Sequence, residues 1–401
     1  MENKDFFKPD DILLPKADFE KWAVIACDQY TSEPEYWQKT AETVGNSKSA
    51  FNLILPEIYL KSDNSQRISK INKTMLEYLS SGVFEEYKNS YIYIERTLKD
   101  GAFRRGIVGV IDLEDYDYTA KSNAPIRATE ETVIERIPPR VNIRRNASIE
   151  LPHIMLLADD KEKTVVEPLQ KKKQFFKKLY DFELMQNGGS ISGYLLDEEA
   201  AQEVRSSVAR LAKASADGPL FVVGDGNHSL ATAKECYRES GNPPARYALV
   251  ELVNLHDDSL KFEPIYRVLF GANPERIINS FTAYCGGQSD GENAQKFTFV
   301  TADGETTVAV APKAKLSVAT LQPFLDRYIK ENPEIKIDYI HGTDSLRMIA
   351  KRENAVGIIF DGMEKDNLFD AVKSDGSLPR KTFSMGHAND KRYYIEARKI
   401  K

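Results

Sequence analysis

The stretch PLFVVGDGNHSLATAKECYRE, residues 219–239, predicts how one buried strand of this protein ends. Its apolar run at 220–223 stops at Gly-Asp-Gly-Asn-His-Ser, and a helix-like pattern follows. Glycine is favoured where the backbone turns sharply or comes close to a ligand. The sequence therefore predicts a strand, a tight turn and a helix that begins near residues 227–229.

A helix that begins directly after such a turn presents unpaired N–H groups, and these groups and the helix dipole attract anions. Asp225 adds a carboxylate, and His228 adds a side chain that titrates near neutrality. An anion seat beside an acid suits phosphoryl transfer. The alternative is a plain turn, in which Asp225 and Asn227 reverse the chain and Ser229 caps the helix. The stretch lacks the lysine of a Walker loop and the glycine spacing of a Rossmann loop.

The composition is that of a globular protein of 401 residues, with 41% hydrophobic residues and a net charge of −6. This acidity argues against a nucleic-acid partner bound through a broad basic surface. The three cysteines, Cys27, Cys236 and Cys285, are too far apart for a metal motif, which favours reduced thiols. No signal-peptide core and no long apolar run is present, so we expect a cytoplasmic protein without a membrane partner. The sequence leaves the oligomeric state open.

The order of strand-like and helical patterns favours an α+β fold with mixed β-sheets and flanking helices. The runs 90–98 and 103–115 predict a hairpin. Further strands are expected at 21–30, 153–157, 245–255, 355–362 and 391–400, and helices at 34–45, 64–89, 161–180 and 197–215. The segment 272–318 looks less regular.

The expected organisation is an N-terminal α+β lobe at 1–120, a core at 121–285 that carries the GDGNHS turn, and a C-terminal α+β segment at 286–401 that completes the site. The composition of 286–295, GGQSDGENAQ, is the most linker-like of the chain. A single compact unit is the alternative.

Two charged clusters could supply further ligands for an anion, because arginine binds phosphate and carboxylate groups through two parallel hydrogen bonds. Each cluster could instead be an exposed, salt-bridged surface. The first cluster, at 128–145, contains Thr129, Glu130, Glu131, Thr132, Arg136, Arg140, Arg144 and Arg145. The second, at 378–398, contains Arg380, Lys381, Ser384, His387, Lys391 and Arg392. Smaller candidates are EPIYR at 263–267, DYIHG at 338–342 and ACDQY at 26–30.

Several long motifs together resemble a bacterial and archaeal family long catalogued as domain of unknown function 1015. The resemblance covers nearly the whole chain, and it implies free L-serine kinase activity with inorganic pyrophosphate as the phosphoryl donor. Its motifs are RATEETVIERIPPRVNIRRNASIELPHIMLL (127–157), DFELMQNGG (181–189), GDGNHSLATAK (224–234), VELVNLHDDSLKFEPIYRV (250–268), DYIHG (338–342) and LPRKTFSMGHANDKRYYIEARKI (378–400).

The GDGNHS turn is also similar to the DGHHR-type loop of the ParB/sulfiredoxin-like superfamily, whose free serine kinases use ADP. That resemblance implies a ParB/sulfiredoxin-like core in a larger, two-lobed chain, with a phosphate held at the helix start. In this sequence Asn227 stands in place of the first histidine of that loop, and Ser229 in place of its arginine. Tyr266 likewise replaces the histidine of the family's EPIHRV motif. Arginines elsewhere in the chain are expected to replace the missing charge.

The resulting hypothesis is a kinase that makes O-phospho-L-serine from free serine and pyrophosphate, with Mg²⁺ as cofactor and small molecules as partners. Its expected catalytic residues are Asp225, His228 and Glu131, with Asp225 also a metal ligand. Its expected phosphate-binding residues are Gly224, Gly226, Asn227, Ser229, Arg140, Arg144, Arg267, Lys381 and Arg392. The expected substrate-binding residues are Arg127, Glu130, Thr132, His341, Ser384 and His387.

Three alternatives use the same residues. The first is a phosphoserine phosphatase, with water as the acceptor. The second is a phosphotransferase that depends on a nucleotide. The third is a nucleotide-responsive binding module by analogy with ParB, which the net acidity and the lack of a helix-turn-helix pattern disfavour.

Overall fold

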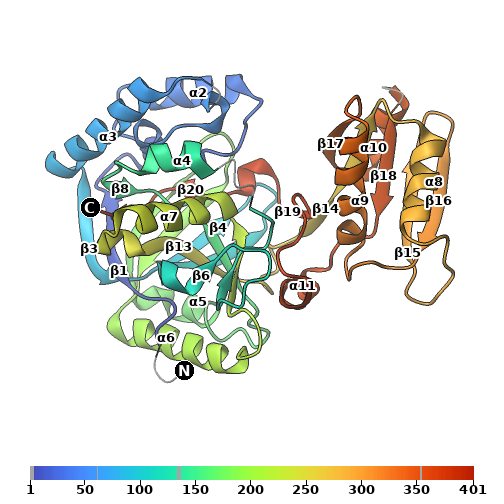
Figure 1. The fold of residues 1–401 in the computed structure, drawn as a ribbon. Coiled ribbons are helices and arrows are strands. Elements are labelled where there is room, and N and C mark those ends of the chain that lie inside the picture. Colours follow the sequence, from blue (N-terminus) through green and yellow to red (C-terminus); the bar gives the residue numbers. More distant parts are fainter. Residues whose placement is uncertain (1–3, 61, 133–136, 353–354) are drawn as a thin grey trace. The chain divides into compact units, whose positions relative to one another are not determined.

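The fold is α+β and consists of two compact units (Figure 1). A computed structural model describes residues 4–60, 62–132, 137–352 and 355–401. Unit 1 comprises Met1–Leu260 and Gly386–Lys401, and unit 2 comprises Lys261–Met385. Unit 2 is therefore inserted in the sequence of unit 1. The three-part division expected from the sequence stays a prediction.

A mixed sheet of nine strands forms the centre of unit 1, in the order β10-β11-β4-β5-β13-β9-β12-β7-β6. The expected hairpin is confirmed as the antiparallel pair β4–β5, whereas β13–β9, β12–β7 and β6–β7 are parallel. The strands are β4 (Ile92–Thr97), β5 (Phe103–Asp112), β6 (Tyr116–Asp117), β7 (Ile126–Arg127), β9 (Met155–Ala158), β10 (Lys177–Glu183), β11 (Ser190–Leu195), β12 (Phe221–Asp225) and β13 (Tyr247–Asn254).

Each face of this sheet has its own hydrophobic core, because successive side chains of a strand point to opposite faces. Ile92 and Ile94 pack with α1 (Phe19–Trp22), α2 (Pro34–Val44) and α3 (Ser65–Ser80) on one face. Tyr93 packs on the other face with α6 (Glu198–Ala214), whose N-terminus is capped by Asp197. Figure 1 shows α2 and α3 on one side of the sheet and α6 on the other.

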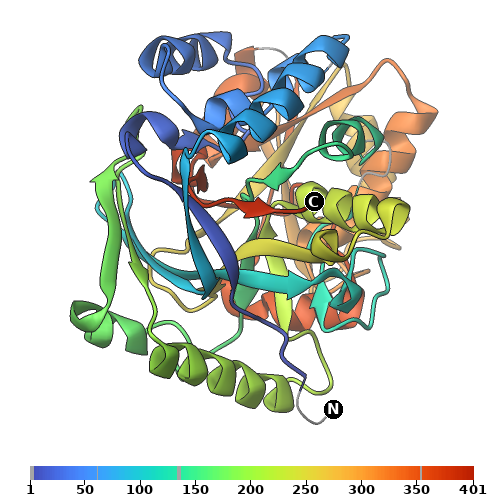
Figure 2. The same ribbon diagram turned by 90° about the vertical axis from the view of Figure 1, so that its left-hand side faces the viewer.

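The C-terminal segment returns to unit 1 and pairs with strands from distant parts of the chain. β20 (Tyr393–Tyr394) pairs with β2 (Val24–Ile25), and β21 (Arg398–Lys399) pairs with β8 (Ile149–Glu150). It also lies beside β1 (Asp10–Pro15), which pairs with β3 (Phe84–Ser90) (Figure 2). The single strand expected at 391–400 is thus wrong. Two short strands form instead, and each belongs to a separate two-stranded sheet.

Unit 2 has a sheet of six strands, five of them in the order β16-β15-β18-β14-β17 and the sixth, β19 (Phe383–Met385), paired to β14. Phe281, Phe297 and Leu321 are fully buried in its core. The strands are β14 (Phe262–Phe270), β15 (Gln295–Val300), β16 (Glu305–Val310), β17 (Lys336–His341) and β18 (Val356–Phe360). The helices are α8 (Pro274–Tyr284), α9 (Ser317–Glu331), α10 (Thr343–Arg352) and α11 (Leu368–Asp375).

Three expectations from the sequence are corrected. The segment 272–318 is regular, since it contains α8, β15 and β16. The helix expected at 161–180 is the short α5 (Pro168–Lys172) followed by strand β10, in which buried Tyr180 and Phe182 alternate with exposed residues. The helix expected at 64–89 ends at Ser80 and gives way to β3. None of the helices in the described ranges is long and apolar enough to cross a bilayer.

Candidate functional site

The GDGNHS turn lies where two parallel strands of unit 1 end. β7 and β12 pair in parallel, so their carboxyl ends meet at the same edge of the sheet. Gly226 follows β12 with φ of 85°, a value that side chains disfavour. A Cβ atom at this position would lie 3.1 Å from Cα of Ile154. The turn therefore needs glycine for its conformation and for space.

Thr129 joins the two strand ends. Its hydroxyl donates to the carbonyl of Val223 (2.6 Å), and its N–H donates to Oδ1 of Asn227 (3.1 Å). Nδ2 of Asn227 in turn donates to Oγ1 of Thr129 (3.2 Å). Thr129 is almost fully buried, with 1% exposure. The Asn227 side chain thus ties the turn to the segment after β7 and does not cap the helix.

Helix α7 (Asn227–Ser240) begins at this turn, and no side chain of the described residues caps it. Gly226 occupies the N-cap position, and Ser229 lies inside the first turn of the helix. The N–H groups of Asn227 and Ser229 have no hydrogen-bond partner in the described parts of the chain. Uncapped N–H groups at a helix start attract anions. The plain capping turn, the alternative from the sequence, would have had Ser229 as the cap.

Asp225 and Lys391 place opposite charges beside this helix start. Oδ2 of Asp225 lies 3.4 Å from Nζ of Lys391, and the two side chains are 18% and 14% exposed. Oδ1 of Asp225 accepts a hydrogen bond from the N–H of Gly226 (3.0 Å). A carboxylate and an ammonium group, both still reachable from solvent, therefore lie next to the helix N-terminus.

Next to Lys391 lies a group of acid–base side chains, Asp28, His153 and Tyr394. The N–H of Cys27 donates to the hydroxyl of Tyr394 (3.1 Å), and that hydroxyl lies 2.8 Å from Nδ1 of His153, within hydrogen-bond distance. Nε2 of His153 lies 3.7 Å from Oδ2 of Asp28. Although burial alone would raise it, the pKa of Asp28 lies below its usual value because of His153, Gln29 and Lys391.

Arg140 lies at the same group of side chains. It forms an ion pair with Glu57, and both side chains are largely buried. Burial raises the pKa of Glu57, with Arg140 opposing that rise, and the carboxylate of Asp28 raises it further. The structure therefore brings a guanidinium that was expected to bind phosphate close to Asp28, with a carboxylate already bound to it.

Arg127 is a buried guanidinium at the end of β7, with 7% exposure. Its Nε donates to the carbonyl of Ala124 (2.8 Å), and within the described residues it has no carboxylate partner. Burial lowers the pKa of Arg127. Because burying an unpaired cation is costly, this residue is well suited to bind an anionic group.

Other residues that were expected at the site in unit 1 have different surroundings. Arg144 is paired with Glu150, and Arg392 with Glu251 and Glu396, so their guanidinium groups are bound by protein carboxylates. His387 forms a capping box with Asp390 at a short 3-10 helix. Glu131 is exposed, Glu130 is half-buried, and the Thr132 hydroxyl is buried without a hydrogen-bond partner among the described residues. Arg136 lies outside the described residues.

Four expected site residues belong to unit 2, whereas the turn belongs to unit 1. Arg267 is fully buried in β14 and donates to Gln322 and to the carbonyls of Ile265, Arg380 and Lys381. Lys381 has φ of 56°. His341 ends β17, and Ser384 lies in β19 opposite Glu263.

The sequence analysis missed three residues near the turn: Asp28, His153 and Lys391. His153 precedes an apolar run and was not singled out, and Asp28 was included only within the smaller candidate ACDQY. Lys391 appeared only within a basic cluster, although its neighbour Arg392 was chosen. The sequence does contain a signal for these residues. Each of them is a polar residue close to the end of a short apolar run, and such a position indicates the end of a strand.

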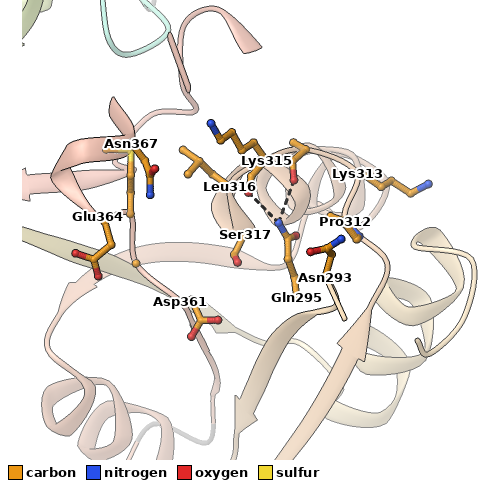
Figure 3. Close-up of a pocket in the computed structure, with 13 residues that line it drawn as sticks. Asn293, Gln295, Pro312, Lys313, Lys315, Leu316, Ser317, Asp361, Glu364 and Asn367 are labelled. Atoms are coloured by element: carbon orange, nitrogen blue, oxygen red, sulfur yellow. Dashed lines mark hydrogen bonds between the residues drawn. The ribbon is translucent and has the colours of Figure 1, made fainter. Parts of the chain in front are cut away.

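A separate pocket of about 600 Å³ opens in unit 2 at the start of α9 (Figure 3). Gln295 forms part of its wall and donates to the carbonyls of Ala314 (3.0 Å) and Lys315 (3.3 Å). Ser317, Asp361 and Glu364 also line it. None of the residues expected at the functional site lines this pocket.

Comparison with protein families gives one match that covers most of the chain. A family model described as "Protein of unknown function (DUF1015)" matches residues 7–328. No curated protein matches the sequence.

Several solved structures resemble this one distantly. A conserved hypothetical protein from Pyrococcus furiosus is 11% identical with a TM-score of 0.41, and the match covers 73% of this chain and 94% of that chain. A free serine kinase mutant in complex with AMP is 12% identical with a TM-score of 0.43, over 71% and 90% of the two chains. C-terminally truncated SbnI from Staphylococcus aureus is 10% identical with a TM-score of 0.36, over 72% and 82%.

Proposed function

This chain belongs to the DUF1015 family of proteins of unknown function, and we propose that it is a kinase that phosphorylates free L-serine with pyrophosphate as the donor. The observation that carries the proposal is the uncapped start of α7 beside Asp225 and Lys391. Those N–H groups bind the donor's anionic oxygens, and Lys391 adds a positive charge. The resemblance of the long sequence motifs to serine kinases supports serine and pyrophosphate as the substrates.

In the proposed reaction, the serine hydroxyl oxygen attacks the terminal phosphorus atom of pyrophosphate. The new O–P bond forms as the bridging P–O bond breaks, and orthophosphate leaves with the electron pair of that bond. Asp225 accepts the hydroxyl proton, because a serine hydroxyl is a weak nucleophile at neutral pH. Phosphoryl transfer otherwise needs mainly positioning and charge stabilisation.

The residues present fit Mg²⁺, the expected cofactor. Mg²⁺ is usually held by one or two carboxylates together with substrate phosphates, and Asp225 offers one partly exposed carboxylate. In the described ranges, no group of three or more His, Cys, Asp or Glu residues could hold a metal alone. When bound, Mg²⁺ neutralises charge on the phosphate oxygens.

Arg127 is the proposed ligand of the serine carboxylate. Its guanidinium is buried at the end of β7, two residues before Thr129, and it has no carboxylate partner among the described residues. Arginine binds a carboxylate through two parallel hydrogen bonds. Glu130, three residues further on, is the proposed ligand of the serine ammonium group.

The proposal is tested by incubating the full-length protein with L-serine, Mg²⁺ and either pyrophosphate, ADP or ATP, and following the products by ³¹P NMR. We expect O-phosphoserine and orthophosphate, formed fastest with pyrophosphate. Faster formation of O-phosphoserine with ADP or ATP would contradict pyrophosphate as the donor but would leave L-serine as the acceptor.

Two other outcomes would overturn the proposal. If no donor supports phosphoserine formation and added phosphoserine is hydrolysed, the protein is a phosphatase. If nothing turns over while a nucleotide or DNA binds, the protein is a binding module.

A further inference from the structure

Two buried arginines hold the chain segment that carries Lys391. Arg96 in β4 is 2% exposed, and it donates to the carbonyls of Asn389 (2.6 Å), Asp390 (3.1 Å) and Lys391 (2.5 Å). Arg104, opposite it in β5, donates to the carbonyl of Asp390 (3.0 Å). Three consecutive carbonyls are thus fixed by two neighbouring guanidinium groups.

This arrangement is an unusual use of buried charge. A buried guanidinium normally pairs with a carboxylate, because desolvation costs several kcal/mol. The described hydrogen bonds of Arg96 all go to main-chain carbonyls. The Nε atoms of Arg96 and Arg104 are buried without a hydrogen-bond partner in the described parts of the chain. Burial and the neighbouring Arg104 lower the pKa of Arg96 to about 9, so it is still charged at pH 7.

The residues after Lys391 are fixed as firmly. The Arg392 side chain is held by Glu251 and Glu396, and its carbonyl accepts from the N–H of Ala26 (3.0 Å). Strand β20 then pairs with β2. The backbone on both sides of Lys391 is therefore fixed, and the Lys391 ammonium lies 3.4 Å from Asp225.

The DFELMQNGG motif (181–189), in which the sequence predicted no site residue, completes the arrangement. The carbonyl of Gly188 accepts the fourth hydrogen bond of Arg96 (3.0 Å). A Cβ atom at Gly188 would lie 2.4 Å from the hydroxyl of Tyr393, which donates to the carbonyl of Met185 (3.1 Å). Glycine is therefore required where the 185–188 turn meets the C-terminal segment.

We infer that Arg96 and Arg104 are positioning residues that fix the Lys391 ammonium at the α7 N-terminus, where it binds the phosphoryl donor. The inference rests on the proposed function and adds to it the two arginines that fix the position of Lys391. We call Arg96 and Arg104 the clamp. If the clamp had only a structural role, its loss would destabilise the fold, but its effect on pyrophosphate binding and kcat would not depend on Lys391.

A double-mutant cycle tests this, with kcat for phosphoserine and the pyrophosphate Kd from calorimetry as readouts. Arg104→Lys keeps the charge but loses the fork that reaches Asp390, so it is the first choice, with Arg96→Lys as a second variant. Arg105→Lys is the matched control. Arg105 is the next residue of β5, and it binds Gln170 and Asp257 instead. Lys391→Ala removes the ammonium.

We expect Arg104→Lys to lower kcat about 10-fold in the wild-type background and less than about 2-fold in the Lys391→Ala background. Methylammonium in the buffer should partly restore Lys391→Ala, while Arg105→Lys should match the wild type. Equal losses in both backgrounds would overturn the inference.

The two proposals fail differently. If the wild type binds pyrophosphate but makes no phosphoserine, only the proposed function fails. The double-mutant cycle of Arg104→Lys and Lys391→Ala, measured on the pyrophosphate Kd, then tests the positioning role of the arginines. If the wild type binds no pyrophosphate, both are overturned.

Discussion

At Gly226 the chain takes a conformation that other residues disfavour, and this single residue sets the angle at which α7 leaves the sheet. Asp225 precedes it and Asn227 follows it, and their side chains take different partners. Asp225 faces Lys391, whereas Asn227 binds Thr129. Gly226 therefore separates a residue that faces the charged group Lys391, Asp225, from a residue that holds the turn in place, Asn227.

Replacing Asp225 by Asn should lower kcat by about 10²–10⁴-fold, because the amide cannot accept the serine proton. The melting temperature should stay close to that of the wild type, since the carboxylate is partly exposed. Asp181→Asn, at an exposed ion pair with Lys178, is the control. A fully active or an unfolded Asp225→Asn protein would make the turn a structural feature only.

Replacing Gly226 by Ala should destabilise the protein by about 2 kcal/mol or more, from the positive φ and the contact with Ile154. It should also weaken pyrophosphate binding. Gly241→Ala is the matched control, because Gly241 caps the other end of α7 at φ of 60° with open space around it. The control should cost about 1 kcal/mol in chemical denaturation and leave the Kd unchanged. Equal effects on the Kd would contradict this account.

At the scale of elements, the parallel pair β7–β12 brings two distant segments to one edge. The sequence predicted the strand, turn and helix of 219–239, because the apolar run, the glycines and the helical pattern are all local. It did not predict that Thr129 binds Asn227, since no local pattern encodes the pairing of β7 with β12. The start of strand β10 was mistaken for the end of a helix because charged residues fill its exposed positions.

Thr129→Val should remove the hydrogen bonds of the hydroxyl to Val223 and Asn227 while keeping the shape of the side chain. We expect a loss of about 1–3 kcal/mol in the free energy of unfolding and a several-fold weaker pyrophosphate Kd. Thr43→Val, at an exposed helical position, should change neither quantity appreciably. An unchanged Kd in Thr129→Val would show that the link between the strands does not shape the anion site.

Glu150 connects three elements through charge. It lies in β8, and it binds Arg144 of α4 (Ile137–Arg144), Arg398 of β21 and the N–H of Leu249 in β13. Although burial opposes it, the arginines hold the pKa of Glu150 below its usual value. A carboxylate whose pKa is lower in the folded than in the unfolded protein stabilises the fold at pH values above its unfolded-state pKa. That stabilisation is lost as the pH falls through the folded-state pKa.

Glu150→Gln should therefore cost about 3 kcal/mol at pH 7, and the difference from the wild type should shrink as the pH falls below about 4.5. Urea unfolding at a series of pH values measures both quantities. A difference that stays constant down to acid pH would contradict the pKa assignment.

At the scale of the whole molecule, residues of unit 2 interrupt the sequence of unit 1 between Leu260 and Gly386. The sequence predicted the α+β class, because strand and helix patterns alternate without regular βαβ units. It did not reveal the insertion, since the linker-like segment 286–295 lies inside unit 2, between α8 and β15. Lys391 shows why the site was only partly predicted, because it reaches Asp225 only once the chain has returned from unit 2.

The segment Lys261–Met385 should fold on its own, because its sheet and buried aromatic core are complete within it. A purified fragment should show one cooperative thermal transition. A fragment without such a transition would mean that unit 2 depends on unit 1 for stability.

The central claim is that the start of α7 holds the phosphoryl donor. A crystal structure of the protein with L-serine and imidodiphosphate, in which nitrogen replaces the bridging oxygen of pyrophosphate, tests it most directly. We expect phosphate oxygens within hydrogen-bond distance of the N–H groups of Asn227 and Ser229, with Lys391 in contact. A helix start filled by the protein's own side chains, with the ligand bound elsewhere, would contradict it.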